Sequence, residues 1–435
     1  MIQRIALISL LTTILLSCQK PINNIPKDDP KHEEPKKEYV EIHSSVNQKT
    51  GWYQTNKLFF DNFFIDTDPA KVNNLYLYNG TIGFTYIPDV QNFFSSRQGS
   101  FYGDLNGDGK ADLFNNYWAA PFGTNKAGYY VTWEHEKLGF SNANIQLGLT
   151  GARKFIFNDY YNNGKPSMLV ASSGVDAIPF PGDSIQIIQF SPSLAMSSDI
   201  ISNIMGYYHT GASADIDNDG DIDILMYSGG GQTKMGPVYL ENKGGGKFQH
   251  KPDLIKGLGY EYNNPNNYYA LELFDVNNDG FIDVILGGSS GGSNPNRILW
   301  GSSSFTFSTS NQTILPFESK YSSVMDFGFT DYDKDSDIDI VLLYEISYQG
   351  FGIQLLENSN GTFKDVTSLK IDISYVANSL WFGWIRIKDF DKDNDIDFVG
   401  DGFGYVKDQE FNKQTPPKIM WLNDGNGVFK ASIKY

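Results

Sequence analysis

A run of alternating aspartates, DIDNDGDID at residues 215–223, is the strongest candidate for chemistry in this sequence. Its spacing is D-x-D-x-D-G-x-x-D, with Asp215, Asp217, Asp219 and Asp223 as the acids and Gly220 in the sixth position. Carboxylates this close repel one another unless a cation offsets their charge. Several hard oxygen ligands on a tight loop suit Ca²⁺ better than Mg²⁺ or Zn²⁺. One isolated copy would also fit a solvated acidic turn, so the case for a metal depends on repetition.

The acidic stretch is repeated along the chain. Further copies begin at Asp104, Asp275, Asp331 and Asp389, and an eroded copy begins at Asp159, where Tyr161 and Ser167 replace ligands. Successive first positions are separated by 55, 56, 60, 56 and 58 residues, a period typical of stacked or circular repeats. We therefore predict about five Ca²⁺ sites and none at the eroded copy. The predicted metal ligands are Asp104, Asn106, Asp108, Asp112, Asp215, Asp217, Asp219, Asp223, Asp275, Asn277, Asp279, Asp283, Asp331, Asp333, Asp335, Asp339, Asp389, Asp391, Asp393 and Asp397.

The residues that flank these loops exclude an EF-hand. An EF-hand loop needs a bidentate Glu at its twelfth position and a helix on each side. The twelfth positions here are not acidic, and the loops lead into short apolar runs such as DILMY and DIVLLY. Such runs are typical of β-strands, so we expect the loops to join strands. The residues in the twelfth positions are Asn115, Met226, Leu286, Leu342 and Gly400.

A second repeated pattern completes the unit. Residues 238–248, 353–363 and 419–429 each read as an apolar strand, a Gly/Asn turn and the start of another strand, which predicts a β-hairpin. Each unit therefore contains four antiparallel strands, with the acidic loop between the first and second strands. Four-stranded units at this period predict the blades of a β-propeller. The length of 41–435 fits seven blades, the first at about residues 45–97 without an intact loop.

The acidic loops resemble those of FG-GAP/VCBS repeats, the units of integrin-α-like calcium-binding propellers. The resemblance covers roughly residues 100–435. It implies an all-β, seven-bladed propeller with Ca²⁺ bound at one face and ligands met on other surfaces. The family includes adhesion proteins, lectins and domains attached to enzymes, so the fold alone does not choose a function.

The acidity of the chain is concentrated in the loops. The formal net charge is −17, and 21 of the 51 Asp and Glu residues lie in the five loops. Five bound Ca²⁺ ions would leave a charge of about −7. An acidic surface of this kind disfavours nucleic acid, whose phosphates require basic residues. We therefore expect no nucleic-acid partner.

The first forty residues predict secretion and anchoring. Residues 1–17 combine Arg4 with a short apolar run and read as a signal peptide. The following Cys18 is the only cysteine, and Leu15 to Cys18 resembles a bacterial lipobox, which implies lipidation at Cys18. Residues 18–40 are rich in proline and charge and are expected to form a disordered tether to the propeller at 41–435. We expect an outer-membrane lipoprotein, exposed at the cell surface, with a periplasmic location left open.

Three classes of function remain. The first is a surface binding or adhesion protein for a glycan or another extracellular ligand. The second is a scaffold for a partner protein, and the third is a carbohydrate-active enzyme of the polysaccharide-lyase type on the same fold. GGSSGG at 287–292 matches G-x-S-x-G, but it follows a strand and no helix follows it, so a nucleophile elbow is disfavoured. We predict no catalytic residues and favour binding.

A ligand surface is predicted at the start of the first strands. In a propeller these strands line the central channel and begin at the face opposite the Ca²⁺ loops. Counting back six or seven residues from each loop gives aromatic and hydrogen-bonding side chains, the types that stack on sugars and pair with carboxylates. The rim predicted in this way contains Arg97, Arg153, His209, Tyr268, Tyr269 and Met325, with Trp381, Phe382 and Trp384.

Overall fold

The computed structural model describes most of the chain after residue 150 and selected strands before it. The described ranges are 151–175, 179–229, 236–258, 268–288, 294–318, 321–346, 350–372, 393–401 and 418–434, with Leu105–Asn106, strands β1 to β7 and strand β26. The chain divides into two units, Met1–Glu38 and Tyr39–Tyr435, and all described residues lie in the second. The predicted signal peptide at 1–17 and tether at 18–40, including Cys18, lie outside them.

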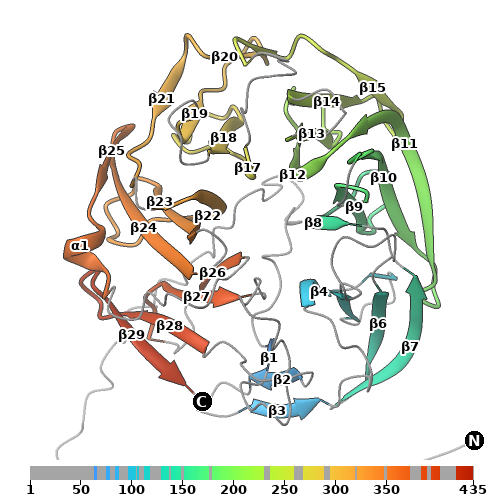
Figure 1. The fold of residues 1–435 in the computed structure, drawn as a ribbon, viewed down its shortest axis with the longest axis horizontal. Coiled ribbons are helices and arrows are strands. Elements are labelled where there is room, and N and C mark those ends of the chain that lie inside the picture. The colour runs from blue at the N-terminus through green and yellow to red at the C-terminus, as the bar shows by residue number, and fades with distance from the viewer. Residues whose placement is uncertain are drawn as a thin grey trace, which may run out of the picture. The chain divides into compact units, whose positions relative to one another are not determined.

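The described part of the second unit is all-β, and its one helix is α1 (Thr367–Lys370). Its main elements are six four-stranded antiparallel sheets, which follow one another in chain order (Figure 1). The first three sheets consist of β4 (Arg97–Gly103), β5 (Asp112–Tyr117), β6 (Tyr129–Glu136) and β7 (Gly139–Leu147); β8 (Ala152–Asn158), β9 (Ser167–Ser172), β10 (Asp183–Phe190) and β11 (Met196–Gly206); and β12 (Tyr208–Ala214), β13 (Asp223–Ser228), β14 (Gly236–Asn242) and β15 (Phe248–His250).

The other three sheets repeat this order. They consist of β17 (Ala270–Phe274), β18 (Asp283–Gly287), β19 (Arg297–Leu299) and β21 (Gln312–Ile314); β22 (Ser323–Thr330), β23 (Asp339–Ile346), β24 (Gly350–Ser359) and β25 (Thr362–Asp365); and β26 (Trp384–Lys388), β27 (Asp397–Asp401), β28 (Lys418–Asn423) and β29 (Phe429–Lys434). The predicted hairpins at 238–248, 353–363 and 419–429 correspond to β14–β15, β24–β25 and β28–β29. The prediction of four-stranded antiparallel units is therefore confirmed.

Two smaller sheets depart from the regular unit. The predicted first blade contains a three-stranded sheet of β1 (Phe63–Ile65), β2 (Leu75–Tyr78) and β3 (Phe84–Ile87) among its described residues. The other sheet is a parallel pair of β16 (Ile255–Lys256) and β20 (Phe307–Ser308). These two strands lie 51 residues apart in the chain, so no local turn signal could have predicted their pairing. The number of seven blades stays a prediction.

The central strands are apolar at successive positions because both of their faces are buried. On β23, Ile340 and Leu342 pack with the sheet that precedes it, whereas Val341 and Leu343 pack with the sheet that follows. Side chains alternate between the two faces of a strand, so a strand buried on both sides needs a continuous apolar run. The run DIVLLY has this form, and the same alternation is found on β13.

The first strands of neighbouring sheets are also joined by buried polar contacts. The Lys154 Nζ on β8 donates to the Leu271 carbonyl at 2.9 Å and to the Glu272 carboxylate on β17 at 2.8 Å. Between these two strands in the chain, Thr210 Oγ1 on β12 accepts a bond from the Leu271 N–H at 3.1 Å. Lys154 and Glu272 are 3% and 1% exposed, so each requires the other as a partner. The first strands of three successive sheets therefore lie close together.

No helix among the described residues has the length and apolar character needed to cross a membrane.

Candidate metal loops and ligand rim

The acidic loops lie between the first and second strands of their sheets, as predicted. The loops after β12, β17 and β22 are described in full, and the loop after β26 is described from Asp393 onward. In the loop after β4, only Leu105 and Asn106 are described, and the Asn106 amide donates to the Pro192 carbonyl at 3.2 Å. The remaining predicted ligands of that loop, with Asp389 and Asp391, stay predictions because nothing of their side chains is described.

The first aspartate of each described loop holds the turn together. Its carboxylate accepts the backbone N–H of the sixth position, with distances of 3.1 Å from Gly220 to Asp215 and 2.8 Å from Gly280 to Asp275. The corresponding bond from Ser336 to Asp331 is 3.1 Å long. These bonds close the loop upon its own first residue. This five-residue closure accompanies the convergence of the acids of the first, third and fifth positions in the loops that begin at Asp215 and Asp331.

Two backbone positions in each loop adopt the left-handed conformation. The sixth position does so in every case described, with φ of 97° at Gly220, 88° at Gly280, 79° at Ser336 and 73° at Asn394. The sequence predicted this from the glycines and from Asn394. The fourth position is also left-handed, a feature that the sequence analysis missed. Glycine, Asn and Asp are the residues that adopt this conformation most readily, and the Asn in the fourth position of two of these loops was the available signal. The fourth positions are Asn218 (φ 58°), Asn278 (φ 55°) and Lys334 (φ 66°).

In two loops the turn gathers three carboxylates. Asp215, Asp217 and Asp219 each present one oxygen, and these oxygens lie within 4.8 Å of one another. The same is true of Asp331, Asp333 and Asp335. In the loop after β17 the third position is Asn277, whose side-chain oxygen is also a hard donor. These donor sets fit a hard divalent cation such as Ca²⁺, and the first, third and fifth positions would hold it.

The ninth aspartate of each loop lies deeper than the other three. Asp223, Asp283 and Asp339 are 0% exposed. In each, one carboxylate oxygen accepts the N–H of the second loop position, at 3.1, 2.9 and 3.2 Å. The other oxygen accepts an N–H from the third strand or the turn that follows it, at 2.8, 2.7 and 2.8 Å. A carboxylate has about four acceptor sites, so these bonds leave capacity for a metal, and ligation by the ninth position stays a prediction.

Burial perturbs the protonation of these acids. It raises the pKa of Asp223 to about 8, of Asp283 to about 7 and of Asp339 to about 8. Burial is also the main cause of the raised pKa of Asp217, Asp275, Asp331 and Asp333, and repulsion by neighbouring loop acids adds to it. Both effects disfavour the charged form, and both would be offset by a bound cation.

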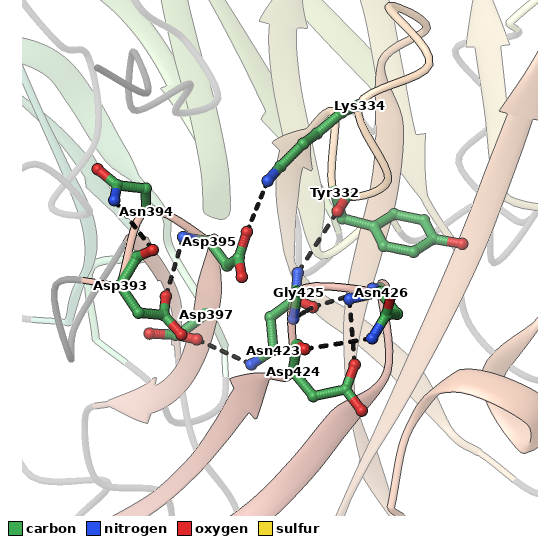
Figure 2. A network of polar contacts seen from close by, with 11 residues as sticks. Tyr332, Lys334, Asp393, Asn394, Asp395, Asp397, Asn423, Asp424, Gly425 and Asn426 are labelled. Atoms are coloured by element: carbon green, nitrogen blue, oxygen red, sulfur yellow. Dashed lines mark hydrogen bonds and ion pairs between the residues drawn. The ribbon is translucent and has the colours of Figure 1, made fainter. Parts of the chain in front are cut away.

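A repeated asparagine at the end of the third strand supports the ninth aspartate and was not among the predicted residues. The backbone N–H groups of Asn242, Asn358 and Asn423 donate to Asp223, Asp339 and Asp397 at 2.8, 2.8 and 2.9 Å. Figure 2 shows Asn423 in this position, between Asp397 and the backbone of Tyr332. The signal was present in the sequence, because each hairpin carries an Asn at the same point before its glycine.

The eroded loop at 159–167 has the same turn without the acids. The Asp159 carboxylate accepts the N–H groups of Asn163 and Gly164 at 2.9 and 2.7 Å. Its fourth and sixth positions, Asn162 and Gly164, are left-handed with φ of 51° and 77°. Tyr161 stands in the third position and donates to Asp199 at 2.7 Å. The loop fold therefore does not depend on the metal-binding acids.

The predicted rim coincides with a repeated irregularity of the first strands. The pairing of the first and second strands shifts register between Arg97 and Gly99, Ala152 and Lys154, Tyr208 and Thr210, and Val324 and Asp326. The extra residue at each β-bulge stands six positions before the first residue of the loop. Bulges change the direction of a side chain and are frequent near binding sites. The bulged residues are Gln98, Arg153, His209 and Met325.

The structure brings some of the predicted rim residues together. The rings of Tyr207 and His209 lie 5.0 Å apart, and those of His209 and Tyr269 lie 4.9 Å apart. Phe180 meets Tyr207 edge to face at 5.7 Å. These four half-buried side chains form one row, which we call the aromatic row, across three successive sheets. The prediction did not include Tyr207, which precedes the bulge, or Phe180, which lies in the connection between β9 and β10.

Other rim residues lie elsewhere. Tyr268 is 1% exposed and packs edge to face on Tyr227 at 5.2 Å, so the structure places it in the core and not at the rim. Its neighbour Tyr269 is half-buried and contacts His209 instead. Arg153 is half-buried, and its Nε donates to Ser173 Oγ at 3.2 Å. The side chains of Arg97, Trp381 and Trp384 lie outside the described residues.

Comparison with known proteins supports the repeat assignment. A family model described as an FG-GAP-like repeat matches residues 215–286 and 275–342, which contain three of the acidic loops. No curated protein matches the sequence. One solved structure, a lectin from Agrocybe aegerita described as recognising non-reducing terminal N-acetylglucosamine, is 16% identical over 67% of this chain and 72% of its own. Its TM-score is 0.43, and at that value the likeness supports no inference about ligand.

The raised pKa values predict how the metal-free protein responds to pH. Because the pKa of Asp223, Asp283 and Asp339 is higher in the folded chain than the unfolded value of about 3.9, folding takes up protons between about pH 4 and pH 8. Their contribution to stability is full below about pH 4 and is lost as the pH rises towards 8. In calcium-free buffer we expect a higher Tm at about pH 5.5 than at pH 8. Scanning calorimetry checks this, and a Tm that rises with pH over this interval contradicts it.

Proposed function

We propose that this chain, whose residues 215–342 match a model of FG-GAP-like repeats, is a calcium-stabilised surface protein that binds an extracellular glycan. In this proposal residues 41–435 form a seven-bladed propeller, and the acidic loops bind about five Ca²⁺ ions at one face. The observation that carries the proposal is the pair of carboxylate clusters at equivalent loop positions, Asp215, Asp217 and Asp219 in one sheet and Asp331, Asp333 and Asp335 in another. The opposite ends of the first strands supply the ligand surface.

Bound Ca²⁺ supplies the positive charge that offsets the carboxylates of the loops. Each cluster places acids together at the edge of a sheet, and burial already disfavours their ionised forms. With an extracellular-module Kd of about 10⁻⁴ to 10⁻³ M, about 1 mM Ca²⁺ contributes roughly 0.4 to 1.4 kcal/mol per site. About five such sites together contribute roughly 2 to 7 kcal/mol, which is comparable to the net stability of a domain. In this proposal the role of the ion is to stabilise the fold.

The aromatic row of Phe180, Tyr207, His209 and Tyr269 supports a glycan as the ligand. Aromatic faces stack on the C–H surfaces of sugars, and Tyr and His add hydrogen-bonding groups at the ring edges. Phe180 is held with φ of 53° between Pro179 and Pro181, a strained conformation for a bulky residue. Such strain is frequent at binding sites. Arg153, at the equivalent bulge of the neighbouring sheet, adds a cation for a sugar carboxylate.

The cellular location is part of the same proposal. The signal peptide at 1–17 directs export, Cys18 carries the lipid, and the tether at 18–40 separates the propeller from the membrane. These assignments depend on the lipobox-like LLSC and on the composition of the tether. An extracellular setting also supplies Ca²⁺ at the concentrations that weak sites need.

Calcium binding is tested by comparing two acids of the same loop. Asp333 belongs to a carboxylate cluster, whereas Asp337 lies outside it and accepts the Asn360 N–H at 2.9 Å. Excess chelator should lower the Tm of the parent protein. Asp333→Asn should lose the stabilisation from one site, about 0.4 to 1.4 kcal/mol, and should therefore show a smaller rise in Tm with calcium. Asp337→Asn should show the same rise as the parent protein. An identical melting curve in calcium and in chelator contradicts the proposal.

The second prediction concerns the ligand. A glycan array probed with the labelled protein in calcium should identify binding, and His209→Ala should weaken it about tenfold, or about 1.4 kcal/mol. Met325→Ala is the matched control, because Met325 stands at the equivalent bulge outside the aromatic row. Both variants should keep the calcium-dependent Tm within about 2 °C. Equal binding by His209→Ala and the parent places the ligand elsewhere.

The third prediction concerns the anchor. Cys18→Ala should remove lipidation and leave the propeller folded, because the proposed tether separates the two. Membrane fractionation checks this: the parent should pellet with the outer membrane and the variant should be soluble. A variant that still pellets with the membrane refutes the lipobox assignment.

A further inference from the structure

Successive loops are joined by the side chain in the fourth position. The Asn162 amide of the eroded loop donates to the Asp221 carboxylate in the next loop. The Asn218 amide donates to the Gly280 carbonyl at 3.3 Å, and the Lys334 ammonium donates to Asp395 at 2.7 Å, as Figure 2 shows. In each case the acceptor belongs to the sixth or seventh position of the following loop. At Asn162, Asn218 and Lys334 the left-handed backbone therefore accompanies a contact between sheets.

A second contact joins successive sheets in the opposite direction, with its donor on the later sheet. The Asn242 side chain donates to the Tyr160 carbonyl at 3.0 Å, while its backbone N–H holds Asp223. The Asn423 side chain likewise donates to the Tyr332 carbonyl at 3.4 Å. Tyr160 and Tyr332 occupy the second position of their loops. Each of these two loops therefore contacts the next sheet at two places. One contact is to the acidic turn, and the other is to the asparagine that holds the ninth aspartate of that turn.

The eroded loop at 159–167 indicates the role of the contacts between successive loops. It lacks the acids needed for a metal, yet it keeps the left-handed turn and both contacts to the following sheet. The packing there is tight, since a Cβ on Gly246 of the next hairpin would lie 2.5 Å from the Tyr161 ring. A loop that binds no ion gains nothing for itself from this geometry. Its contacts act on the loop at 215–223.

We propose that three fourth-position side chains, Asn162, Asn218 and Lys334, are positioning residues for calcium, each raising the affinity of the loop that follows it in the chain. The proposal rests on calcium being the ion of the proposed function. A loop already held by its neighbour loses less conformational freedom when it binds an ion, so it binds more tightly. The coupling is reciprocal: an ion in one loop also stabilises the contact to the loop before it. Where the contact is Lys334 to Asp395, the ammonium also reduces repulsion in a loop with five acids.

The clearest test uses Asn162, because its loop has no carboxylate cluster of its own to lose. Asn162→Gly removes the amide and keeps the left-handed backbone, for which glycine carries no strain. Hydrogen exchange at a series of calcium concentrations gives the concentration that half-protects each loop. We expect this midpoint to rise about three- to tenfold for residues 215–223, the effect of one lost hydrogen bond, and to stay unchanged for 331–339.

Asn278→Gly is the matched control. Asn278 has the same loop position and a φ of 55°, but within the described residues its side chain makes no hydrogen bond to the loop at 331–339. Its replacement should leave the midpoint of that loop unchanged. The coupling is refuted if Asn162→Gly does not shift the loop at 215–223, or if it shifts the loops at 215–223 and 331–339 equally. If calcium protects no loop in the parent protein, the calcium proposal fails as well.

Discussion

The burial of closely spaced carboxylates is the constraint on which the acidic loops depend most. The fold places up to five acids in nine residues at the junction of two strands and buries the last of them completely. Asp223, Asp283 and Asp339 are held there by two backbone N–H groups each, which compensates for part of the lost hydration. Their raised pKa values show that the compensation is incomplete. A divalent cation at the acids of the first, third and fifth positions would supply the missing positive charge.

The position of these loops follows from the packing of the sheets. Central strands such as β23 are buried on both faces, so polar residues can lie only at the strand ends. At one end the loops meet in chain order through Asn162, Asn218 and Lys334. At the other end of the first strands, bulges in three of the sheets direct Arg153, His209 and Met325 out of the regular register. The same strands thus separate the acidic loops at one end from the bulged residues at the other.

Much of this could be predicted from the sequence, because the relevant signals are local. The loops at 215–223 and 331–339, the hairpins that follow them and the absence of helical periodicity are set by turn residues and strand patterns within about ten residues. The features that could not be predicted join distant residues. The pairing of Ile255 with Phe307 and the bond from Lys154 to Glu272 belong to this group. Tyr268 was placed at the rim because counting along a strand does not reveal which of two neighbouring residues faces the core.

The measurement that tests the central claim most directly is the amount of calcium bound per chain. Equilibrium dialysis of the metal-free protein against about 1 mM Ca²⁺, followed by elemental analysis, should find about two to five ions per chain for sites with Kd of about 10⁻⁴ to 10⁻³ M. Asp331→Asn/Asp333→Asn should reduce that number by up to one ion without loss of the others. No calcium above that of the dialysis buffer would contradict the account.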